Sequence, residues 1–516
     1  MLDIKNLTIT MNKDNRELVR DLSFTLNPGD KAAIIGEEGN GKSTVLKLIH
    51  SPQSVESYCS WSGEIITNKA IIGYLEQDMN TADSGLSVYQ YFCKYIPDSN
   101  YDYNSQVKIF SDLGLEPLLF YEDRMINTLS GGEKVKVQLA KILMCSPDVL
   151  LLDEPTNDLD IDTVIWLESF IKECKLPILY VSHDETLLEN TANKIIHLEQ
   201  LRKKSMPRCT VQKTDYRNYV EARMGKFQRQ EQVARNERAE FKEKMDRWRQ
   251  IYSKVEHRQN TISRGDPSGG RLLKKKMHSL KSMEARYEKE KESFTDFPEA
   301  EEAILVSFGD DISLPASKRV LDFQIDSLTV GDANRVLARN INLSVTGPER
   351  VGIIGANGCG KTTLLRIIAQ ELLQRTDINA AYMPQNYSEL LDPDQTPVSL
   401  LAKDGSKDEI TVARTFLGSM KYTHEEMTGK ISALSGGQKA KLLFLSMILR
   451  GCNVLILDEP TRNFSPLSNP VIRKVLIGYK GAIISISHDR KYLSEVCDKV
   501  YRLTPEGLIL QNTDET

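Results

Sequence analysis

Two similar stretches decide the fold: Lys31-Ala-Ala-Ile-Ile-Gly-Glu-Glu-Gly-Asn-Gly-Lys42-Ser43 and Arg350-Val-Gly-Ile-Ile-Gly-Ala-Asn-Gly-Cys-Gly-Lys361-Thr362. Each has a short apolar run, a loop that matches G-x-x-x-x-G-K-[ST], and then an apolar segment (TVLKLI or TLLRII). Glycines let such a loop turn its backbone N–H groups toward phosphate oxygens, while the lysine reaches the terminal phosphates. A chance glycine-rich turn beside a lysine is a poor explanation of two copies. The sequence therefore predicts a strand, a phosphate-binding loop and a helix, twice.

Further motifs repeat in the same order, which indicates an internal duplication. The two loop lysines are 319 residues apart, and the LSGG, DEPT and SHD motifs of the two copies are each 305 apart. Short apolar runs between helical regions favour mostly parallel, buried strands in each copy. We predict an α/β protein with two tandem phosphate-loop domains, at 1–200 and 320–516, joined by a helical-hairpin linker at 201–319.

Composition agrees with a multidomain protein of 516 residues, of which 40% are hydrophobic and 27% charged. No segment approaches the roughly 20 apolar residues that a spanning helix needs, and charges near the N-terminus argue against a signal peptide. The eight cysteines form no CxxC pair, so reduced thiols are expected rather than a disulfide framework or a zinc site. We expect a cytoplasmic protein with no membrane partner.

The phosphate loops supply most of the candidate nucleotide-binding residues. The hydroxyl of Ser43 or Thr362 is the expected Mg²⁺ ligand in each loop. The loop residues assigned to nucleotide binding are Gly36, Gly39, Gly41, Lys42, Ser43 and Thr44 in the first copy, and Gly355, Gly358, Gly360, Lys361, Thr362 and Thr363 in the second.

Paired carboxylates end an apolar strand in VLLLDEPTN (149–157) and VLILDEPTR (454–462). Asp153 and Asp458 are placed to hold Mg²⁺ through water. Glu154 and Glu459 can polarise the water that attacks the γ-phosphorus. Taken alone, either motif could be an acidic turn that follows a core strand. Because each motif comes after a phosphate loop in the sequence, a Mg²⁺ and water-positioning site is the better interpretation.

Taken together, the motifs resemble those of the ATP-binding-cassette (ABC) ATPases. The matching residues are Gln77 and Gln385 (also expected at Mg²⁺), the LSGG residues Ser130, Gly131, Gly132, Ser435, Gly436 and Gly437, and the terminal histidines His183 and His488. The resemblance implies that LSGG of one copy closes over the nucleotide held by the other, so that two ATP molecules bind between the domains of one chain, a monomer. It also implies a catalytic, γ-phosphate-sensing role for the two histidines.

The linker differs from both copies in charge. Residues 202–294 contain 26 Lys and Arg against 13 Asp and Glu, whereas the whole chain has a net charge of -5. Apolar residues at helical spacing over 219–256 and 271–294 predict two helices that fold back on each other, with the break at 266–270. A solvated coiled-coil surface is the alternative reading of these charges, but a basic tip favours phosphate contacts. The RNA-binding candidates are Lys254, Arg258, Arg264, Arg271, Lys274, Lys275, Lys276 and Lys281.

Two cassettes, no membrane segment and a charged helical linker are similar to the ABC-F family, as are the sequences DEPTNDLD and DYRNYVEAR. The resemblance implies an ATPase that binds the ribosomal tRNA exit site in its ATP-closed form. Its linker would reach the P-site tRNA, the 23S-type rRNA and the peptidyl-transferase region, and hydrolysis would release it. The absence of a long arm insertion, together with the long basic linker, favours the antibiotic-resistance branch of that family.

Two departures from the family pattern stand out. Asp158 replaces the usual histidine of DEPTNHLD, and the second copy reads DEPTRNFSPLSNP without LD. These differences predict unequal roles for the two ATP sites. The alternative functions are a housekeeping translation factor of the same family, a cassette ATPase that acts on DNA, and the energy subunit of a transporter.

Overall fold

The structure is a computed structural model that describes residues 2–77, 79–96, 103–201, 206–261, 267–298, 312–330, 335–402 and 404–511. The chain divides into two compact units. One contains Met1–Tyr216 and Glu301–Thr516, and the other contains Arg217–Ala300. The first unit holds the two predicted α/β copies, which we call the N-lobe and the C-lobe, and the second holds the hairpin. Within the described ranges, no helix combines the length and the hydropathy needed to cross a lipid bilayer.

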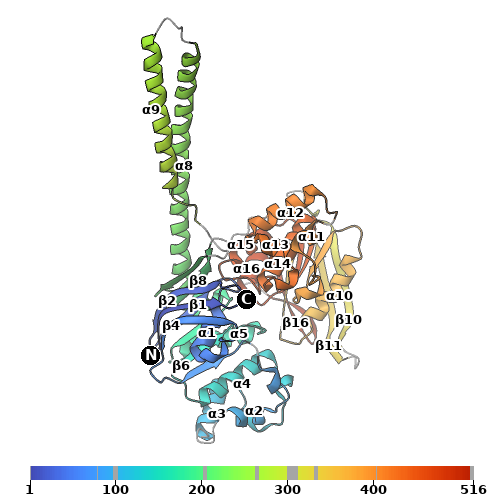
Figure 1. The fold of residues 1–516 in the computed structure, drawn as a ribbon. Coiled ribbons are helices and arrows are strands. Elements are labelled where there is room, and N and C mark those ends of the chain that lie inside the picture. The colour runs from blue at the N-terminus through green and yellow to red at the C-terminus, as the bar shows by residue number, and fades with distance from the viewer. Residues whose placement is uncertain are drawn as a thin grey trace. The chain divides into compact units, whose positions relative to one another are not determined.

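The N-lobe contains a six-stranded sheet and a three-stranded antiparallel sheet (Figure 1). The larger sheet has the order β5-β6-β7-β3-β8-β9 and is parallel except at its β8–β9 edge. The smaller has the order β2-β1-β4. The strands are β1 (Leu2–Met11), β2 (Glu17–Leu26), β3 (Lys31–Ile35), β4 (Cys59–Ile66), β5 (Ile72–Leu75), β6 (Val149–Asp153), β7 (Ile178–Val181), β8 (Lys194–Gln200) and β9 (Met206–Gln212).

The C-lobe repeats the larger sheet with the order β13-β14-β15-β12-β16-β17 and adds a two-stranded antiparallel sheet, β10-β11. The strands are β10 (Arg319–Val330), β11 (Arg335–Thr346), β12 (Arg350–Ile354), β13 (Ala380–Met383), β14 (Val454–Asp458), β15 (Ala482–Ile486), β16 (Lys499–Thr504) and β17 (Gly507–Gln511).

Helices cover the two large sheets. The N-lobe helices are α1 (Lys42–His50), α2 (Val88–Tyr95), α3 (Tyr103–Asp112), α4 (Gly131–Met144), α5 (Ile161–Glu173) and α6 (Glu185–Thr191). The C-lobe helices are α10 (Lys361–Leu373), α11 (Pro397–Leu401), α12 (Lys407–Ser419), α13 (His424–Thr428), α14 (Gly436–Leu449), α15 (Asn469–Ile477) and α16 (Arg490–Val496).

The predicted apolar strands lie at the centre of these sheets. Every residue of β3 and β6 is buried, as expected for central parallel strands that are covered on both faces. Because β3, β6 and β7 are parallel neighbours, their carboxyl ends meet at one edge of the sheet. The phosphate loop, the DEPT carboxylates and the SHD histidine follow these three ends, and β12, β14 and β15 repeat the arrangement in the C-lobe.

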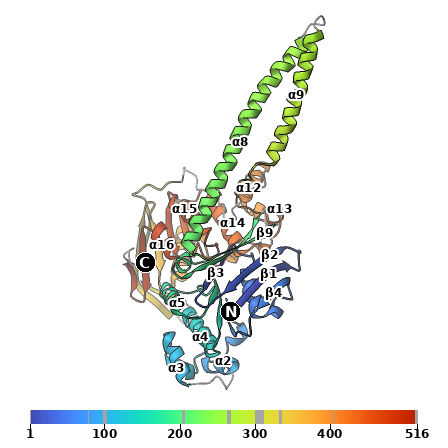
Figure 2. The same ribbon diagram turned by 90° about the vertical axis from the view of Figure 1, so that its left-hand side faces the viewer.

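The linker forms the predicted antiparallel helical hairpin. Helices α8 (Tyr216–Thr261) and α9 (Pro267–Glu292) run side by side in both ribbon views (Figures 1 and 2). Between them lies a small apolar core of Trp248, Val255, Leu280 and Tyr287. The Trp248 indole N–H also donates to Leu280 O at 3.0 Å.

Two predicted boundaries need correction. The second hairpin helix begins at Pro267 rather than near 271, so 267–270 is helical. Proline suits the first helical turn, where its missing N–H would have no intrahelical partner. The domain boundary predicted at residue 200 falls between two paired strands, because β9 extends the N-lobe sheet beside β8.

Candidate active site

The first glycine of each phosphate loop lies against a neighbouring strand. Gly36 and Gly355 adopt φ values of 147° and 155°. A Cβ atom on Gly36 would lie 2.2 Å from Leu198 O, and one on Gly355 would lie 2.9 Å from Leu503 O. Any larger residue would push the loop away from β8 or β16, so these positions require glycine.

The loop lysines are buried and folded into their own loops. Lys42 Nζ donates to Gly36 O at 2.9 Å and to Glu37 O at 3.0 Å. Lys361 Nζ donates to Gly355 O at 2.8 Å and to Ala356 O at 3.0 Å. Each loop therefore concentrates an ammonium and several backbone amides at the start of a helix, which is the arrangement that binds phosphate.

The serine of the first loop meets the first DEPT carboxylate. Ser43 Oγ donates to Asp153 Oδ1 at 2.8 Å, and the Tyr74 hydroxyl donates to Asp153 Oδ2 at 3.1 Å. Tyr74 was not among the predicted site residues. Its only sequence signal is its position three residues before Gln77, which Tyr382 repeats before Gln385.

These oxygen groups fit a Mg²⁺ ion. Burial raises the pKa of both Asp153 and Asp458, which marks carboxylates in need of a cation. Asp458 Oδ2 is buried and has no hydrogen-bond partner among the described residues. Hydroxyl and carboxylate oxygens are also the ligands that Mg²⁺ prefers.

Glu154 is held firmly by its neighbours. Its carboxylate accepts hydrogen bonds from Gln77 Nε2 at 3.2 Å and from Asn157 Nδ2 at 2.7 Å, and lies 3.3 Å from His183 Nε2. Burial alone would raise the pKa of Glu154, but the hydrogen bond and charge of His183 outweigh it and lower that pKa to about 2. The backbone of Glu154 has a φ of 46°, a left-handed conformation that is uncommon outside glycine and concentrates at functional sites. Asn157 is a second residue that the sequence did not single out.

Glu459 is held less firmly, although its φ of 53° matches. Its Oε2 accepts a hydrogen bond from His488 N at 3.3 Å. Its Oε1 lies 3.6 Å from His488 Nε2 and is buried without a hydrogen-bond partner among the described residues. Burial, together with the charge of Asp458, raises the pKa of Glu459 to about 8. Burial and the charge of Lys361 lower the pKa of His488 to about 4. The residue equivalent to Asn157 is Arg462, whose guanidinium pairs with Asp158.

Arg462 instead pairs with Asp158 of the other lobe. Arg462 Nη2 lies 2.9 Å from Asp158 Oδ1. Asp158 is one of the departures from the family pattern, and Arg462 stands where the first copy has Asn157. This contact therefore joins the DEPT segments of the two lobes.

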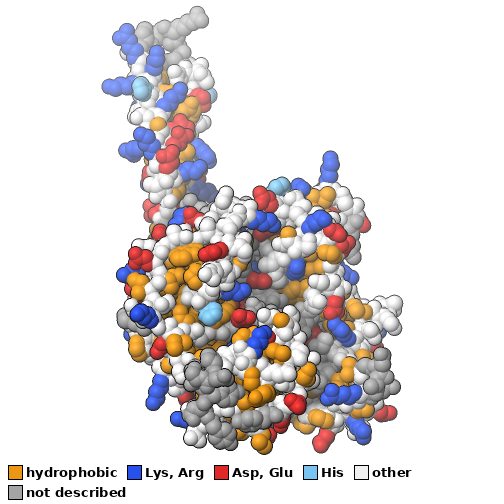
Figure 3. Space-filling model, turned by 60° about the horizontal axis from the view of Figure 1, so that its bottom comes forward, with side chains coloured by type: hydrophobic (Ala, Val, Ile, Leu, Met, Phe, Trp, Pro, Cys, Tyr) orange, Lys and Arg blue, Asp and Glu red, His pale blue; other side chains and the backbone are white. Residues whose placement is uncertain are grey.

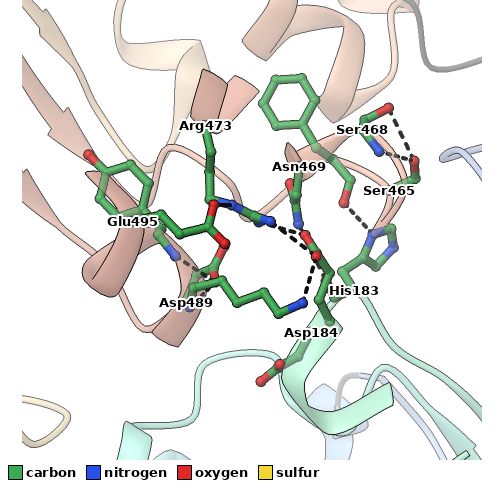
Figure 4. Close-up of polar contacts among 12 residues, drawn as sticks. His183, Asp184, Ser465, Ser468, Asn469, Arg473, Asp489 and Glu495 are labelled. Carbon is green, nitrogen blue, oxygen red and sulfur yellow. Dashed lines mark hydrogen bonds and ion pairs between the residues drawn. The ribbon is translucent and has the colours of Figure 1, made fainter. Parts of the chain in front are cut away.

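The loop that follows the second DEPT motif reaches the first histidine. His183 Nδ1 donates a hydrogen bond of 2.6 Å to Phe464 O, and Asn469 Nδ2 donates to His183 O at 3.5 Å (Figure 4). The corresponding atom of the second histidine, His488 Nδ1, is buried without a hydrogen-bond partner in the described part of the chain. The first histidine is thus fixed by both lobes.

A buried ion-pair cluster lies beside this contact. Arg473 of α15 makes two hydrogen bonds to Glu185 of α6, at 2.6 and 3.1 Å, and a third to Glu495 (Figure 4). Lys491 adds ion pairs to Glu185 and Glu189. Further ion pairs across the lobes are Arg490 with Glu168 and Asp184, Arg502 with Asp162, and Lys441 with Glu37.

Both lobes contribute to two cavities at the loops. The first cavity is about 250 Å³ and is lined by predicted residues and by Arg462 and Asn463 of the C-lobe. The second is about 640 Å³ and includes Asn157 and Asp158 of the N-lobe. The predicted residues in the first are Gly39, Gly41, Lys42, Ser43, Thr44, Gln77, Glu154 and His183. Those in the second are Gly131, His183, Gly358, Gly360, Lys361, Thr362, Thr363, Gln385, Asp458, Glu459 and His488.

The LSGG segments start helices α4 and α14. Gly131 lines the second cavity, whereas Ser130 caps α4 by accepting from Glu133 N, and Gly132 packs against Thr163. In the C-lobe, Ser435 caps α14 in the same way, and Gly437 N donates to Glu38 Oε2 of the first phosphate loop at 2.7 Å. A Cβ atom on Gly436 would lie 3.2 Å from the same carboxylate oxygen.

The basic residues predicted to bind RNA lie on the hairpin, except that Arg264 falls outside the described residues. Figure 3 shows Lys and Arg side chains gathered toward the end of the hairpin. The seven described candidates, which we call the tip cations, are all exposed. They are Lys254, Arg258, Arg271, Lys274, Lys275, Lys276 and Lys281.

Comparisons with known proteins agree with this geometry. A family model described as "ABC transporter" matches residues 19–157 and 338–462. The ATP-binding protein Uup of Buchnera aphidicola subsp. Acyrthosiphon pisum (strain APS) is 28% identical over 530 residues, which cover 99% of this chain and 81% of that protein. ABC transporter F family member 2 of Arabidopsis thaliana is 25% identical over 545 residues, with coverages of 95% and 75%. The solved structure named RNase-L Inhibitor matches with a TM-score of 0.59 at 17% identity, covering 98% of this chain and 91% of that one.

Proposed function

The chain belongs to the ATP-binding cassette family as a tandem ABC-F ATP hydrolase, and from this premise we propose that it is a ribosome-associated ATPase whose hairpin contacts RNA. Two ATP molecules bind between the lobes and close them. Hydrolysis then opens the lobes and releases the protein from the ribosome. The observation that carries the RNA contact is the set of exposed tip cations on an otherwise acidic chain.

The first site performs hydrolysis with residues that lie together. Lys42 and the loop amides bind the β- and γ-phosphates. Ser43 and Asp153, with Gln77, hold Mg²⁺, which neutralises charge on the phosphate oxygens when it is bound. The Glu154 carboxylate, fixed by Gln77 and Asn157, orients the attacking water and accepts its proton, while His183 faces the γ-phosphate.

The second site uses the equivalent groups in a looser arrangement. Lys361 and the loop amides bind phosphates, Thr362 and Asp458 with Gln385 hold Mg²⁺, and Glu459 with His488 faces the γ-phosphate. Gly131 of the N-lobe lines the same cavity and closes over its nucleotide.

The ribosomal part of the proposal extends to the P-site tRNA and the 23S-type rRNA. The tip cations bind their phosphates, so the affinity falls as salt rises. In the antibiotic-resistance branch of the family, this contact displaces drugs bound at the peptidyl-transferase centre. Drug susceptibility with and without the gene, across lincosamides, pleuromutilins, macrolides and phenicols, separates that role from a housekeeping role.

A trapped variant tests the ribosome as the partner. Glu154→Gln combined with Glu459→Gln removes the groups that orient water and leaves the ATP-binding residues intact. We expect this variant to co-sediment with ribosomes when ATP and Mg²⁺ are present and to stay in the supernatant with ADP. Absence from the ribosome pellet at moderate salt, with ATP bound, would refute the ribosomal proposal.

A hairpin variant tests the RNA contact in the same trapped background. Lys274→Gln, Lys275→Gln and Lys276→Gln remove three tip cations, and we expect binding to ribosomes to weaken about tenfold or more, with a shallower dependence on salt. The control is Arg229→Gln, Lys242→Gln and Lys289→Gln, which removes the same charge from exposed hairpin positions outside the tip cations. Equal weakening in both variants would mean that the tip makes no specific contact. Tighter binding to duplex DNA than to tRNA or ribosomal RNA in a gel-shift assay would favour the DNA-directed alternative.

A further inference from the structure

The two phosphate loops differ at their second and third positions. The first loop carries Glu37 and Glu38, whereas the second carries Ala356 and Asn357. A loop that binds phosphate gains nothing from two nearby negative charges, because like charges repel. The structure shows that both carboxylates instead contact the C-lobe.

Glu37 anchors the first loop to the loop that follows the second DEPT motif. Its Oε1 accepts a hydrogen bond from Ser465 Oγ at 2.8 Å and another from Ser468 Oγ, and its Oε2 lies 3.6 Å from Lys441 Nζ. Burial would raise the pKa of Glu37, but Lys441 and the two hydroxyl groups outweigh it and lower that pKa. Glu37 is therefore an ionised carboxylate with a complete set of partners on the other lobe.

Glu38 occupies the start of helix α14. Its Oε2 accepts the hydrogen bond from Gly437 N, and the same oxygen would lie 3.2 Å from a Cβ atom on Gly436. Glu38 also lines the first cavity together with Lys42, Ser43 and His183. One carboxylate thus lies in the nucleotide cavity and also accepts a hydrogen bond from an LSGG amide of the opposite lobe.

The N-terminus of a 14-residue helix such as α14 attracts an anion through its free amides and its dipole. In the closed site the γ-phosphate of ATP needs these LSGG amides. Gly437 N cannot serve the carboxylate and the phosphate at once, and two anions in one place repel each other. ADP has no γ-phosphate and does not enter this competition.

We propose that Glu38 is a specificity-determining positioning residue that occupies the Gly437 amide at the start of α14 and is displaced by the γ-phosphate of ATP at the first site. Glu38 thereby lowers the affinity of the first site for ATP while leaving its affinity for ADP unchanged, so the first site closes only at higher ATP concentrations. Glu37 remains bound to Ser465 and Ser468 and keeps the loop beside α14 during the exchange. The inference rests on the part of the proposed function that places ATP between the lobes and is independent of the ribosome.

The second site shows the same position of the phosphate loop without a competing carboxylate. Asn357, which corresponds to Glu38, donates from Nδ2 to Asp158 O and lies beside Gly131. A neutral amide that donates to a backbone carbonyl leaves the amides of α4 available to a phosphate. The second phosphate loop, with Asn357, therefore shows the arrangement that we expect Glu38→Asn to produce in the first.

Nucleotide affinity tests the proposal in the full-length chain. Every protein carries Lys361→Ala, so that nucleotide binding is measured at the first site alone. Titration calorimetry then compares the affinity for ADP with that for the non-hydrolysable analogue AMPPNP, both with Mg²⁺. We expect Glu38→Gln and Glu38→Asn to bind AMPPNP about fivefold more tightly and to bind ADP within twofold of the parent. The control is Glu64→Gln, an exposed glutamate on β4 of the same lobe, which should change neither affinity. An unchanged AMPPNP affinity, or equal shifts for AMPPNP and ADP, overturns the proposal.

Hydrogen exchange at the start of α14 provides a second measurement. It distinguishes an error in the role of Glu38 from an error in placing ATP between the lobes. Without added nucleotide, Glu38→Asn should speed exchange of the Gly437 amide relative to the parent, and saturating AMPPNP should remove the difference. If Glu38→Asn exchanges like the parent without nucleotide and AMPPNP slows the exchange in both proteins, Glu38 does not have the proposed role but the shared site remains. If AMPPNP fails to slow the exchange of this amide in Glu38→Asn, ATP does not bind between the lobes and both proposals fail.

Discussion

The two catalytic glutamates occupy equivalent positions on equivalent strands, but their surroundings differ. Glu154 accepts hydrogen bonds from Gln77 and Asn157 and lies 3.3 Å from His183 Nε2, whereas Glu459 accepts one hydrogen bond, from His488 N, and lies 3.6 Å from His488 Nε2. Part of the difference arises at one position, because Arg462 stands where Asn157 stands in the N-lobe. Two copies of one motif can therefore share the same backbone and still differ in how well the reacting group is positioned.

The largest expected effect concerns the support of the first site. Arg473→Met removes the two-bond partner of the buried Glu185, which lies two residues after His183, and leaves Glu185 with Lys491 alone. Breaking a buried pair in this way costs on the order of 3 kcal/mol. We expect a lower melting temperature and a first site as loosely held as the second. The control is Arg502→Met, which breaks a more exposed pair with Asp162 and should cost about 1 kcal/mol or less. Equal losses in thermal unfolding experiments would contradict the importance of the buried cluster.

The next effect compares the two glutamates directly. Glu154→Gln should lower the rate of ATP hydrolysis by about 10²-fold, because it removes a general base that is already held in place. Glu459→Gln should lower the rate by less than about twofold, because the second site contributes the smaller share of the turnover. Steady-state hydrolysis by the full-length chain measures both, with the double variant as the baseline. A greater loss from Glu459→Gln would reverse the assignment of the faster site.

A smaller effect is expected from the amide that holds Glu154. Asn157→Ala deletes the 2.7 Å hydrogen bond and leaves the carboxylate itself in place. We expect kcat to fall about tenfold with little change in KM, because the carboxylate loses orientation rather than nucleotide affinity. A change in KM alone would assign Asn157 to binding instead.

The smallest effect runs in the opposite direction. Arg462→Asn gives the second site the amide that it lacks. In the Glu154→Gln background, where the second site accounts for hydrolysis, the rate should rise about threefold. An unchanged rate would mean that another feature limits Glu459. Asp158→Asn serves as the control, because it also breaks the Asp158–Arg462 pair but supplies no amide near Glu459.

The sequence predicted the features that depend on local pattern. The glycine loops, the buried strands before them and the carboxylates after β6 and β14 all appear where the motifs place them, because short-range chemistry determines each one. The contacts that distinguish the two sites join residues hundreds of positions apart, such as Glu38 with Gly437 and His183 with Phe464. No local pattern contains these pairings. The left-handed backbone of Glu154 is likewise set by tertiary packing, since glutamate has no intrinsic preference for it.

The ion pairs that join the lobes have a consistent polarity. In each pair named above the carboxylate belongs to the N-lobe, as in Asp158, Glu168 and Glu185, and the cation belongs to the C-lobe, as in Arg462, Arg473 and Arg490. Two N-lobes from different copies would oppose acid to acid, and two C-lobes would oppose base to base. A tandem protein with similar halves risks exchanging them between molecules. This distribution of charge discourages pairings between like halves and favours the pairing of an N-lobe with a C-lobe.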